Sequence, residues 1–246
     1  MRYKMAEKNT KLILSNNLDV KTGEITVNDR AATRKAIINY LEKFLPVISK
    51  NKFLERSEWG ARAANNGLED EWDYTSIVIH HQGNSPQHIC SATYGALREV
   101  QNNHMDKKDF SDIGYHYAVD CTGVIAEGRD IRFKGSHVNK NNAKKIGILL
   151  LGDFSKPGEA KLSFKDFSTW TDQFDSDYMR KIPDAQLAAL KVLIKCLKNF
   201  FEIIELGGHK EFALSDDTRT CPGSVVMEKI VELRKEFRLN KPTKVK

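Results

Sequence analysis

The fold is decided by the stretch Thr75-Ser76-Ile77-Val78-Ile79-His80-His81-Gln82-Gly83, an apolar run that ends in two histidines and a glycine. Three consecutive β-branched residues favour a strand buried on both faces, so the polar groups that begin at His80 are expected where the strand leaves the core. Chemistry in α/β proteins is found at such strand ends. Because successive side chains point to opposite faces, His80 and His81 cannot both reach one ligand unless the strand bends.

Helical and extended patterns alternate on either side of this strand. Helical spacing of apolar residues occurs in 30–49, 93–104, 183–201 and 224–237, and strand-like runs occur at 114–119, 124–127 and 146–152. The alternation predicts an α/β fold with a central mixed β-sheet flanked by helices.

Three regions are expected along the chain. Residues 1–52 form a small N-terminal appendage, with a hairpin turning around Gly23 and then the first helix, docked on a main domain at 53–240. An insertion at about 155–182 has aromatic residues three to four positions apart, which favours a packed helix over a ligand-binding stripe. A basic tail at 241–246 is expected to fray.

Composition bounds the class of protein. With 246 residues, 40% hydrophobic and 29% charged, the chain predicts a soluble globular protein, which we expect to be a monomer. The net charge of +6 and the pI near 9.0 suit a polyanionic partner such as nucleic acid, anionic lipid or the acidic polymers of a bacterial wall. Lysines are scattered and no nucleic-acid-binding motif is recognisable, which argues against nucleic acid.

Secretion and redox signals are weak. No apolar run reaches the roughly 18 residues of a membrane helix, and the N-terminus lacks the apolar core of a signal peptide. Synthesis in the cytoplasm is therefore expected, with export only by a specialised route. Four cysteines in so long a chain do not predict a disulfide framework. Cys196 fits a buried helix position, whereas Cys221, in Thr220-Cys221-Pro222-Gly223, is the candidate for function.

Two histidines and this cysteine are candidate ligands of one zinc ion. His80 ends the strand, His209 follows a Gly-Gly pair, and Cys221 comes eleven intervening residues later. Two imidazoles and a thiolate leave the fourth tetrahedral position open, which is typical of a catalytic rather than a structural site. Spacing alone does not establish such a site, because two histidines and a cysteine often occur at such distances by chance.

Seven motifs in fixed order strengthen the assignment. They are Ser57-Glu58-Trp59-Gly60-Ala61-Arg62, Ile77-Val78-Ile79-His80-His81, Ser111-Asp112-Ile113-Gly114-Tyr115-His116-Tyr117, Glu127-Gly128-Arg129-Asp130, Ile146-Gly147-Ile148, Gly208-His209-Lys210 and Thr220-Cys221-Pro222-Gly223. Over about 56–237 the chain resembles the zinc-dependent N-acetylmuramoyl-L-alanine amidases of the peptidoglycan-recognition-protein and phage-lysozyme type. The resemblance implies a central sheet flanked by helices, zinc on His80, His209 and Cys221, and cleavage of the amide between N-acetylmuramic acid and L-alanine.

The resemblance also implies roles around the metal. Tyr115 would place its hydroxyl near the zinc-bound water or the oxyanion, and His137 would line the cleft and contact the oxyanion or substrate. The family has lysine or threonine where this chain has Arg219, which could stabilise an oxyanion but could not act as a general base. Three further residues, His81, His116 and Arg129, are assigned to substrate binding. For His81 a supporting role beside the ligand is the alternative, and for His116 it is support of the sheet edge. Asp217 is a competing ligand, and His88 and His104 are expected to be structural or exposed.

The sequence is compatible with several functions and biological settings. Some relatives with this fold lack the cysteine and only bind peptidoglycan, so a non-catalytic binding module is one alternative; a basic nucleic-acid-binding protein is another. The enzyme could be a phage endolysin, an antibacterial effector delivered to the periplasm of a rival, or a cytoplasmic recycling enzyme acting on muropeptides. An effector would require an immunity or inhibitor protein as a partner.

Overall fold

The structure is a computed structural model that describes residues 12–16, 19–23, 27–48, 53–83, 93–156, 159, 181–214 and 219–243. The strands are β1 (Leu12–Asn16), β2 (Asp19–Gly23), β3 (Phe53–Leu54), β4 (Ser76–His81), β5 (Tyr117–Val119), β6 (Ile125–Glu127), β7 (Lys145–Leu150) and β8 (Glu205–Gly208). The helices are α1 (Val27–Ile48), α2 (Thr93–Asn102), a π-helical turn η2 (Asn103–Lys107), α3 (Asp184–Phe200), α4 (His209–Phe212) and α5 (Ser224–Phe237).

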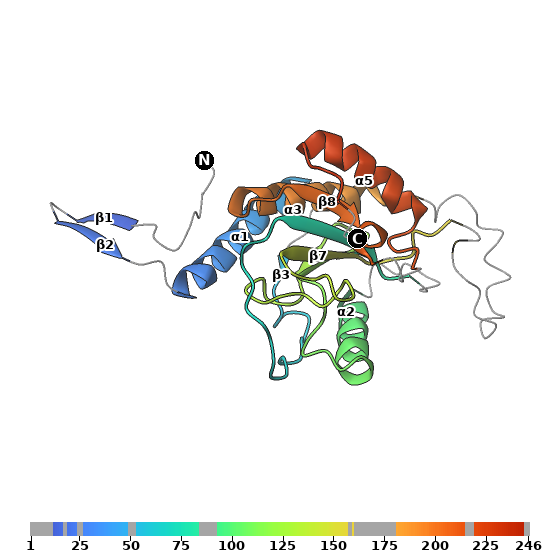
Figure 1. Ribbon diagram of the computed structural model, residues 1–246, viewed down its shortest axis with the longest axis horizontal. Helices are drawn as coiled ribbons and strands as arrows, with labels where there is room; N and C mark the ends of the chain where they lie inside the picture. Colours follow the sequence, from blue (N-terminus) through green and yellow to red (C-terminus); the bar gives the residue numbers. More distant parts are fainter. Residues whose placement is uncertain are drawn as a thin grey trace.

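Six strands form one mixed sheet in the order β3-β6-β5-β7-β4-β8. Neighbouring strands are parallel except for the β5–β6 pair, which is antiparallel as the hairpin prediction required. Figure 1 shows α1, α3 and α5 on one side of this sheet and α2 on the other. The predicted α/β fold with a central mixed sheet is therefore confirmed.

Side-chain alternation divides β4 and β7 between the two faces of the sheet. Ile77 and Ile79 of β4 are fully buried in the largest hydrophobic cluster, which also contains residues of α1, α3 and α5. Val78 belongs to a separate cluster with Val138 and Phe212. His80 therefore continues the Val78 side, and His81 continues the side of the large core.

Helix α1 packs into this same core. Ile37, Ile38, Leu41 and Leu45 are at most 1% exposed, while Phe44, a member of the predicted apolar face, is 39% exposed. Arg34 forks onto the Glu127 carboxylate on β6, with N–O distances of 2.6 and 2.5 Å. The helix thus contributes both apolar side chains and a cation to the main domain.

Some local predictions were wrong. The N-terminal hairpin pairs Leu12 with Gly23, so Gly23 ends a strand and is not the turn. Pro183 precedes α3 as its N-cap residue, although it was expected to begin the helix. Cys121 is disulfide-bonded, although the four cysteines did not predict a disulfide framework. The predicted aromatic helix of the insertion also lies outside the described residues.

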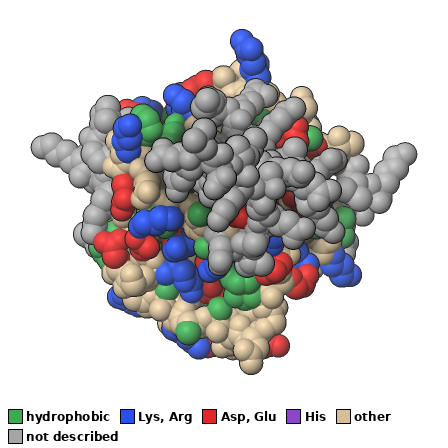
Figure 2. Space-filling model, turned by 90° about the vertical axis from the view of Figure 1, so that its left-hand side faces the viewer, with side chains coloured by type: hydrophobic (Ala, Val, Ile, Leu, Met, Phe, Trp, Pro, Cys, Tyr) green, Lys and Arg blue, Asp and Glu red, His purple; other side chains and the backbone are tan. Residues whose placement is uncertain are grey.

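Surface charge is mixed where it is visible. On the face shown in Figure 2, described basic and acidic side chains lie next to one another instead of forming a surface of one sign. Such a mixture does not favour a polyanionic duplex. Among the described helices, none is both long enough and apolar enough to span a bilayer.

Candidate metal centre and cleft

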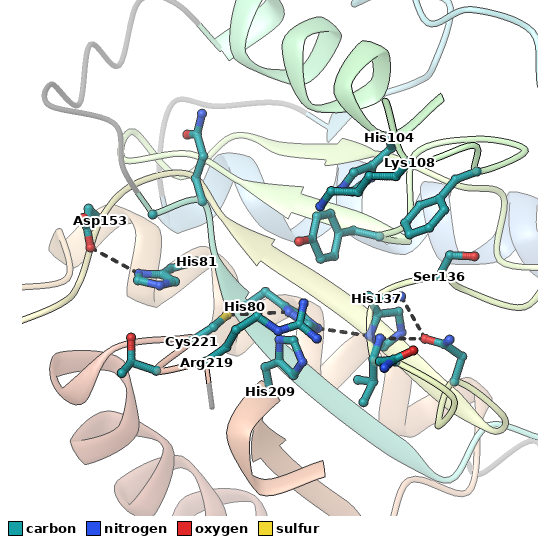
Figure 3. Close-up of a pocket in the computed structure, with 18 of the residues that line it drawn as sticks. His80, His81, His104, Lys108, Ser136, His137, Asp153, His209, Arg219 and Cys221 are labelled. Atoms are coloured by element: carbon teal, nitrogen blue, oxygen red, sulfur yellow. Dashed lines mark hydrogen bonds and ion pairs between the residues drawn. The ribbon is translucent and has the colours of Figure 1, made fainter. Parts of the chain in front are cut away.

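The three predicted ligands converge at the carboxyl ends of two neighbouring strands. β4 and β8 are parallel and pair Ile79 with Gly208, so the residues that follow, His80 and His209, emerge side by side. Cys221 lies in the turn before α5. One ligand atom from each of the three residues lies within 4.8 Å of the others, and Figure 3 shows the three side chains facing one another.

Close backbone packing fixes where His209 and Cys221 lie. A Cβ atom at Gly208 would come within 2.5 Å of Pro222 Cδ, so only glycine allows β8 to pass under the Cys221–Pro222 turn. Lys210 N donates to Cys221 O at 3.0 Å, which joins the first turn of α4 to that loop. The Gly-Gly pair, which sequence propensity does not favour in a strand, is thus a packing requirement.

The donor set fits a zinc ion. His80 and His209 are 1% and 2% exposed. Burial, followed by the charge of His209, holds the pKa of His80 well below its usual value and keeps the imidazole neutral, as a ligand must be. His80 Nδ1 lies 3.7 Å from Cys221 Sγ. Two ligands of a tetrahedral zinc ion at usual Zn–N and Zn–S lengths are about 3.6 Å apart.

A cleft of about 770 Å³ opens beside these residues. Tyr115 reaches it from the loop before β5, with its ring centroid 4.9 Å from that of His80. Burial raises the pKa of Tyr115, so its hydroxyl stays protonated at neutral pH. Arg219 lines the cleft two residues before Cys221.

His81 occupies the opposite side of β4 from His80, as alternation predicts. Its Nδ1 accepts a hydrogen bond from Phe154 N at 3.1 Å and lies 3.4 Å from Asp153 Oδ1. Figure 3 shows His81 turned toward Asp153 and away from the three grouped ligands. The ring still borders the cleft, which leaves its predicted contact with substrate untested.

Two residues assigned to substrate binding are buried in the scaffold. His116 is fully buried; its Nδ1 accepts from Gly147 N, and its Nε2 lies 3.0 Å from Phe133 O. Arg129 is 3% exposed and donates to the carbonyls of Ile113, Lys134 and Asp112. Neither lines the cleft. The geometry therefore favours a structural role for both, because their polar atoms bond to the protein's own backbone.

His137 lies between the ligands and the scaffold. It borders the cleft but is only 7% exposed. Its Nδ1 lies 3.0 Å from His80 Nε2, and its Nε2 lies 3.3 Å from Lys145 O. The side chain that was expected to face substrate thus contacts a proposed metal ligand directly.

The cleft is also lined by His104, which was expected to be structural or exposed, and by Lys108, which the sequence did not single out. His104 accepts from Gly114 N at 2.9 Å through Nδ1, and burial lowers its pKa to about 4. Lys108 follows η2, and burial, together with the Arg219 charge, lowers its pKa. Both residues precede the Gly-Tyr-His motif in the chain. They reach the cleft from η2, which continues α2 directly, and from the residue after it, and no local pattern indicates this placement. Asp217 and His88 lie outside the described residues.

Comparison with known proteins identifies related chains. A model of the family described as N-acetylmuramoyl-L-alanine amidase matches residues 71–224. Peptidoglycan-recognition protein SC2 of Drosophila simulans is 26% identical over 180 residues, which are 72% of this chain and 83% of that protein. Wild-type PGRP-LB of Drosophila has a TM-score of 0.59 and 23% identity, covering 79% of this chain and 99% of that one. Human PGRP-IBETAC, solved with glycosamyl muramyl pentapeptide, has a TM-score of 0.55 and 22% identity, covering 72% and 93%.

Proposed function

The chain belongs to the N-acetylmuramoyl-L-alanine amidase family, and on that premise we propose that it is a zinc-dependent hydrolase of the amide between N-acetylmuramic acid and L-alanine. The observation that carries the proposal is the convergence of ligand atoms from His80, His209 and Cys221 within 4.8 Å at the wall of a cleft. Peptidoglycan or soluble muropeptides are the proposed substrates. A human structural neighbour was solved with a muramyl pentapeptide, which supports this substrate class.

His80, His209 and Cys221 would hold one zinc ion. Three protein ligands leave a position open for substrate or water. Zinc, when bound, supplies Lewis acidity toward the scissile carbonyl and toward water. The chain's own contribution is to present two buried imidazoles and a cysteine sulfur beside the open cleft.

Tyr115 and Arg219 are the proposed catalytic side chains. A tyrosine whose hydroxyl keeps its proton is a hydrogen-bond donor to the oxygen on which negative charge develops. Arg219 is permanently cationic, so it stabilises that same charge electrostatically and does not accept the proton of the attacking water. The proton must then pass to another acceptor or to solvent.

A second reading is a non-catalytic peptidoglycan-binding module. The matched relatives are named recognition proteins, which supports binding without cleavage. The complete three-residue donor set beside Tyr115 favours catalysis.

The proposed setting is action on the bacterial wall. An endolysin, or an effector delivered to the periplasm and opposed by an immunity protein, meets its substrate outside the reducing cytosol. The disulfide at Cys121 supports such a compartment. A recycling enzyme acting on muropeptides in the cytoplasm is the competing proposal, and activity with the disulfide reduced would favour it.

Digestion of purified peptidoglycan tests the function. Wild-type protein, Cys221→Ala and chelator-treated wild type are incubated with sacculi, and the products are analysed by mass spectrometry. We expect free stem peptides and intact glycan strands only from the untreated wild type. Cut glycan strands, or release of peptides by Cys221→Ala, would refute the proposal. Binding of sacculi by wild-type protein without release would favour the binding module.

A further inference from the structure

The His137 ring joins a backbone carbonyl to the proposed ligand His80. A carbonyl oxygen only accepts hydrogen bonds, so the contact between His137 Nε2 and Lys145 O places the proton on Nε2. In a neutral imidazole, Nδ1 is then an acceptor. His80 Nε2, 3.0 Å away, must be the donor to it. His80 is thereby left with an unprotonated Nδ1, and this is the atom that faces Cys221 Sγ at 3.7 Å.

Two glycines form a slot that fits this ring. A Cβ atom at Gly147 would lie 2.5 Å from His137 Cδ2 and 2.7 Å from its Cγ. A Cβ atom at Gly135 would also lie 2.5 Å from Cδ2. Gly147 interrupts a strand otherwise rich in large apolar residues, and the ring above it supplies the reason. Any side chain at either position would displace the imidazole.

The loop that carries His137 is fixed independently. Asn142 Oδ1 accepts hydrogen bonds from the backbone N–H groups of His137 (2.8 Å) and Val138 (2.7 Å). Ser136 N donates to Gly114 O at 3.0 Å. Figure 3 shows His137 held between His80 and the residues of this loop. Backbone, side-chain and steric contacts therefore all orient one ring.

We propose that His137 is a positioning residue that holds His80 as its Nε2–H tautomer, so that the Nδ1 lone pair points into the three-residue ligand group. The inference rests on the proposed zinc site, because the tautomer matters only if His80 binds a metal. Outer partners of metal-binding histidines raise metal affinity by about 10- to 100-fold. His137 would thus act on zinc retention, whereas the sequence resemblance suggests contact with substrate.

The tautomers can be measured without any variant. Long-range nitrogen–proton correlation spectra of metal-free wild-type protein, labelled with nitrogen-15 in histidine, distinguish protonated from unprotonated ring nitrogens. We expect Nε2–H tautomers for both His80 and His137. An Nδ1–H tautomer on either ring would overturn the inference whatever the zinc affinity.

A matched pair of variants tests the consequence for the metal. Asparagine and leucine have the same branched shape, but only asparagine places an acceptor near the position of Nδ1. We expect His137→Leu to weaken zinc binding by about 10- to 100-fold in competition with a chromophoric chelator, and His137→Asn to weaken it less. Circular dichroism of the metal-free proteins checks that both variants fold.

The outcomes separate the two proposals. If wild-type protein binds no zinc, both the proposed function and this inference fail. If wild type binds zinc and the leucine variant binds it equally well, or if both variants lose affinity equally, only the inference fails. A loss of turnover at unchanged zinc affinity would assign His137 to substrate and would overturn the positioning role.

Discussion

The two faces of the six-stranded sheet bury different kinds of side chain, although the same strands supply both faces. On the α1–α3 side, Ile77, Ile79 and their neighbours belong to one large apolar cluster. On the other side, Leu97 of α2 packs in a second, smaller apolar cluster with residues of β3, β5, β6 and β7. Beside the cleft, the alternate residues of β4 and β7 include His80 and Gly147, and the cluster around Val78 has two further described members, Val138 and Phe212. The side covered by α1, α3 and α5 (the apolar face) therefore holds most of the hydrophobic core. The opposite side (the cleft face) keeps a smaller core under α2, and next to the cleft it holds histidine rings in fixed orientations.

An ion pair with a buried carboxylate joins α1 to the sheet on the apolar face, and breaking it is expected to have the largest effect. Glu127 is 3% exposed and accepts both hydrogen bonds from Arg34. Arg34→Met leaves this carboxylate buried without its main partner, which should lower the free energy of unfolding by about 3–5 kcal/mol. Urea unfolding of metal-free protein measures the change.

Arg30 on the same helix is the matched control. Its contact with Asp70 is 3.9 Å long and largely exposed, so Arg30→Met should cost about 1 kcal/mol or less. Equal decreases in the free energy of unfolding for the two variants would show that the Arg34–Glu127 ion pair does not stabilise the packing of α1 on the sheet.

Lowering the pH should destabilise the fold by protonating buried histidines on the cleft face. Burial lowers the pKa of His116 from its usual 6.5 to about 4. Between these values the unfolded chain binds a proton that the folded chain does not, so stability is full above pH 6.5 and is lost as the pH falls toward 4. The loss attributable to His116 is about 3 kcal/mol. The free energy of unfolding of metal-free wild type and of His116→Asn is measured at pH 7 and pH 4. The decrease between the two pH values should be smaller in the variant, and an equal decrease would refute the assignment to His116.

Arg219 is expected to have a smaller effect, confined to turnover. Arg219→Ala removes a cation that faces the cleft, and should lower kcat by about 10- to 100-fold with zinc content unchanged. Arg219→Lys keeps the charge and should retain more activity. Loss of zinc in the alanine variant would mean that the residue supports the metal site instead.

The apolar face was largely predictable, because its residues recur at helix and strand periods. α5 and the β4 strand were placed within a residue of their observed ends. β8 was missed because Gly207 and Gly208 have low strand propensity; they are required by tight packing, which one sequence does not reveal.

The cleft face was predictable only in part. Alternation separated His80 from His81 without a structure. His116 and Arg129 were assigned to substrate binding, with support of the sheet edge as the alternative for His116. Their polar atoms bond to distant backbone groups, which favours a structural role. The contact between His137 and His80 joins residues 57 positions apart in the sequence. The only hint of it in the sequence was Gly147, a glycine within an apolar strand, which leaves room for the His137 ring.

We infer that β4 presents His80 to a metal and turns His81 away from it. Zinc per chain, measured by elemental analysis after dialysis of wild type, His80→Ala and His81→Ala, tests it most directly. We expect about one zinc ion per chain in the wild type and in His81→Ala, and essentially none in His80→Ala. Zinc retained by His80→Ala, or lost from His81→Ala while that variant stays folded, would contradict it.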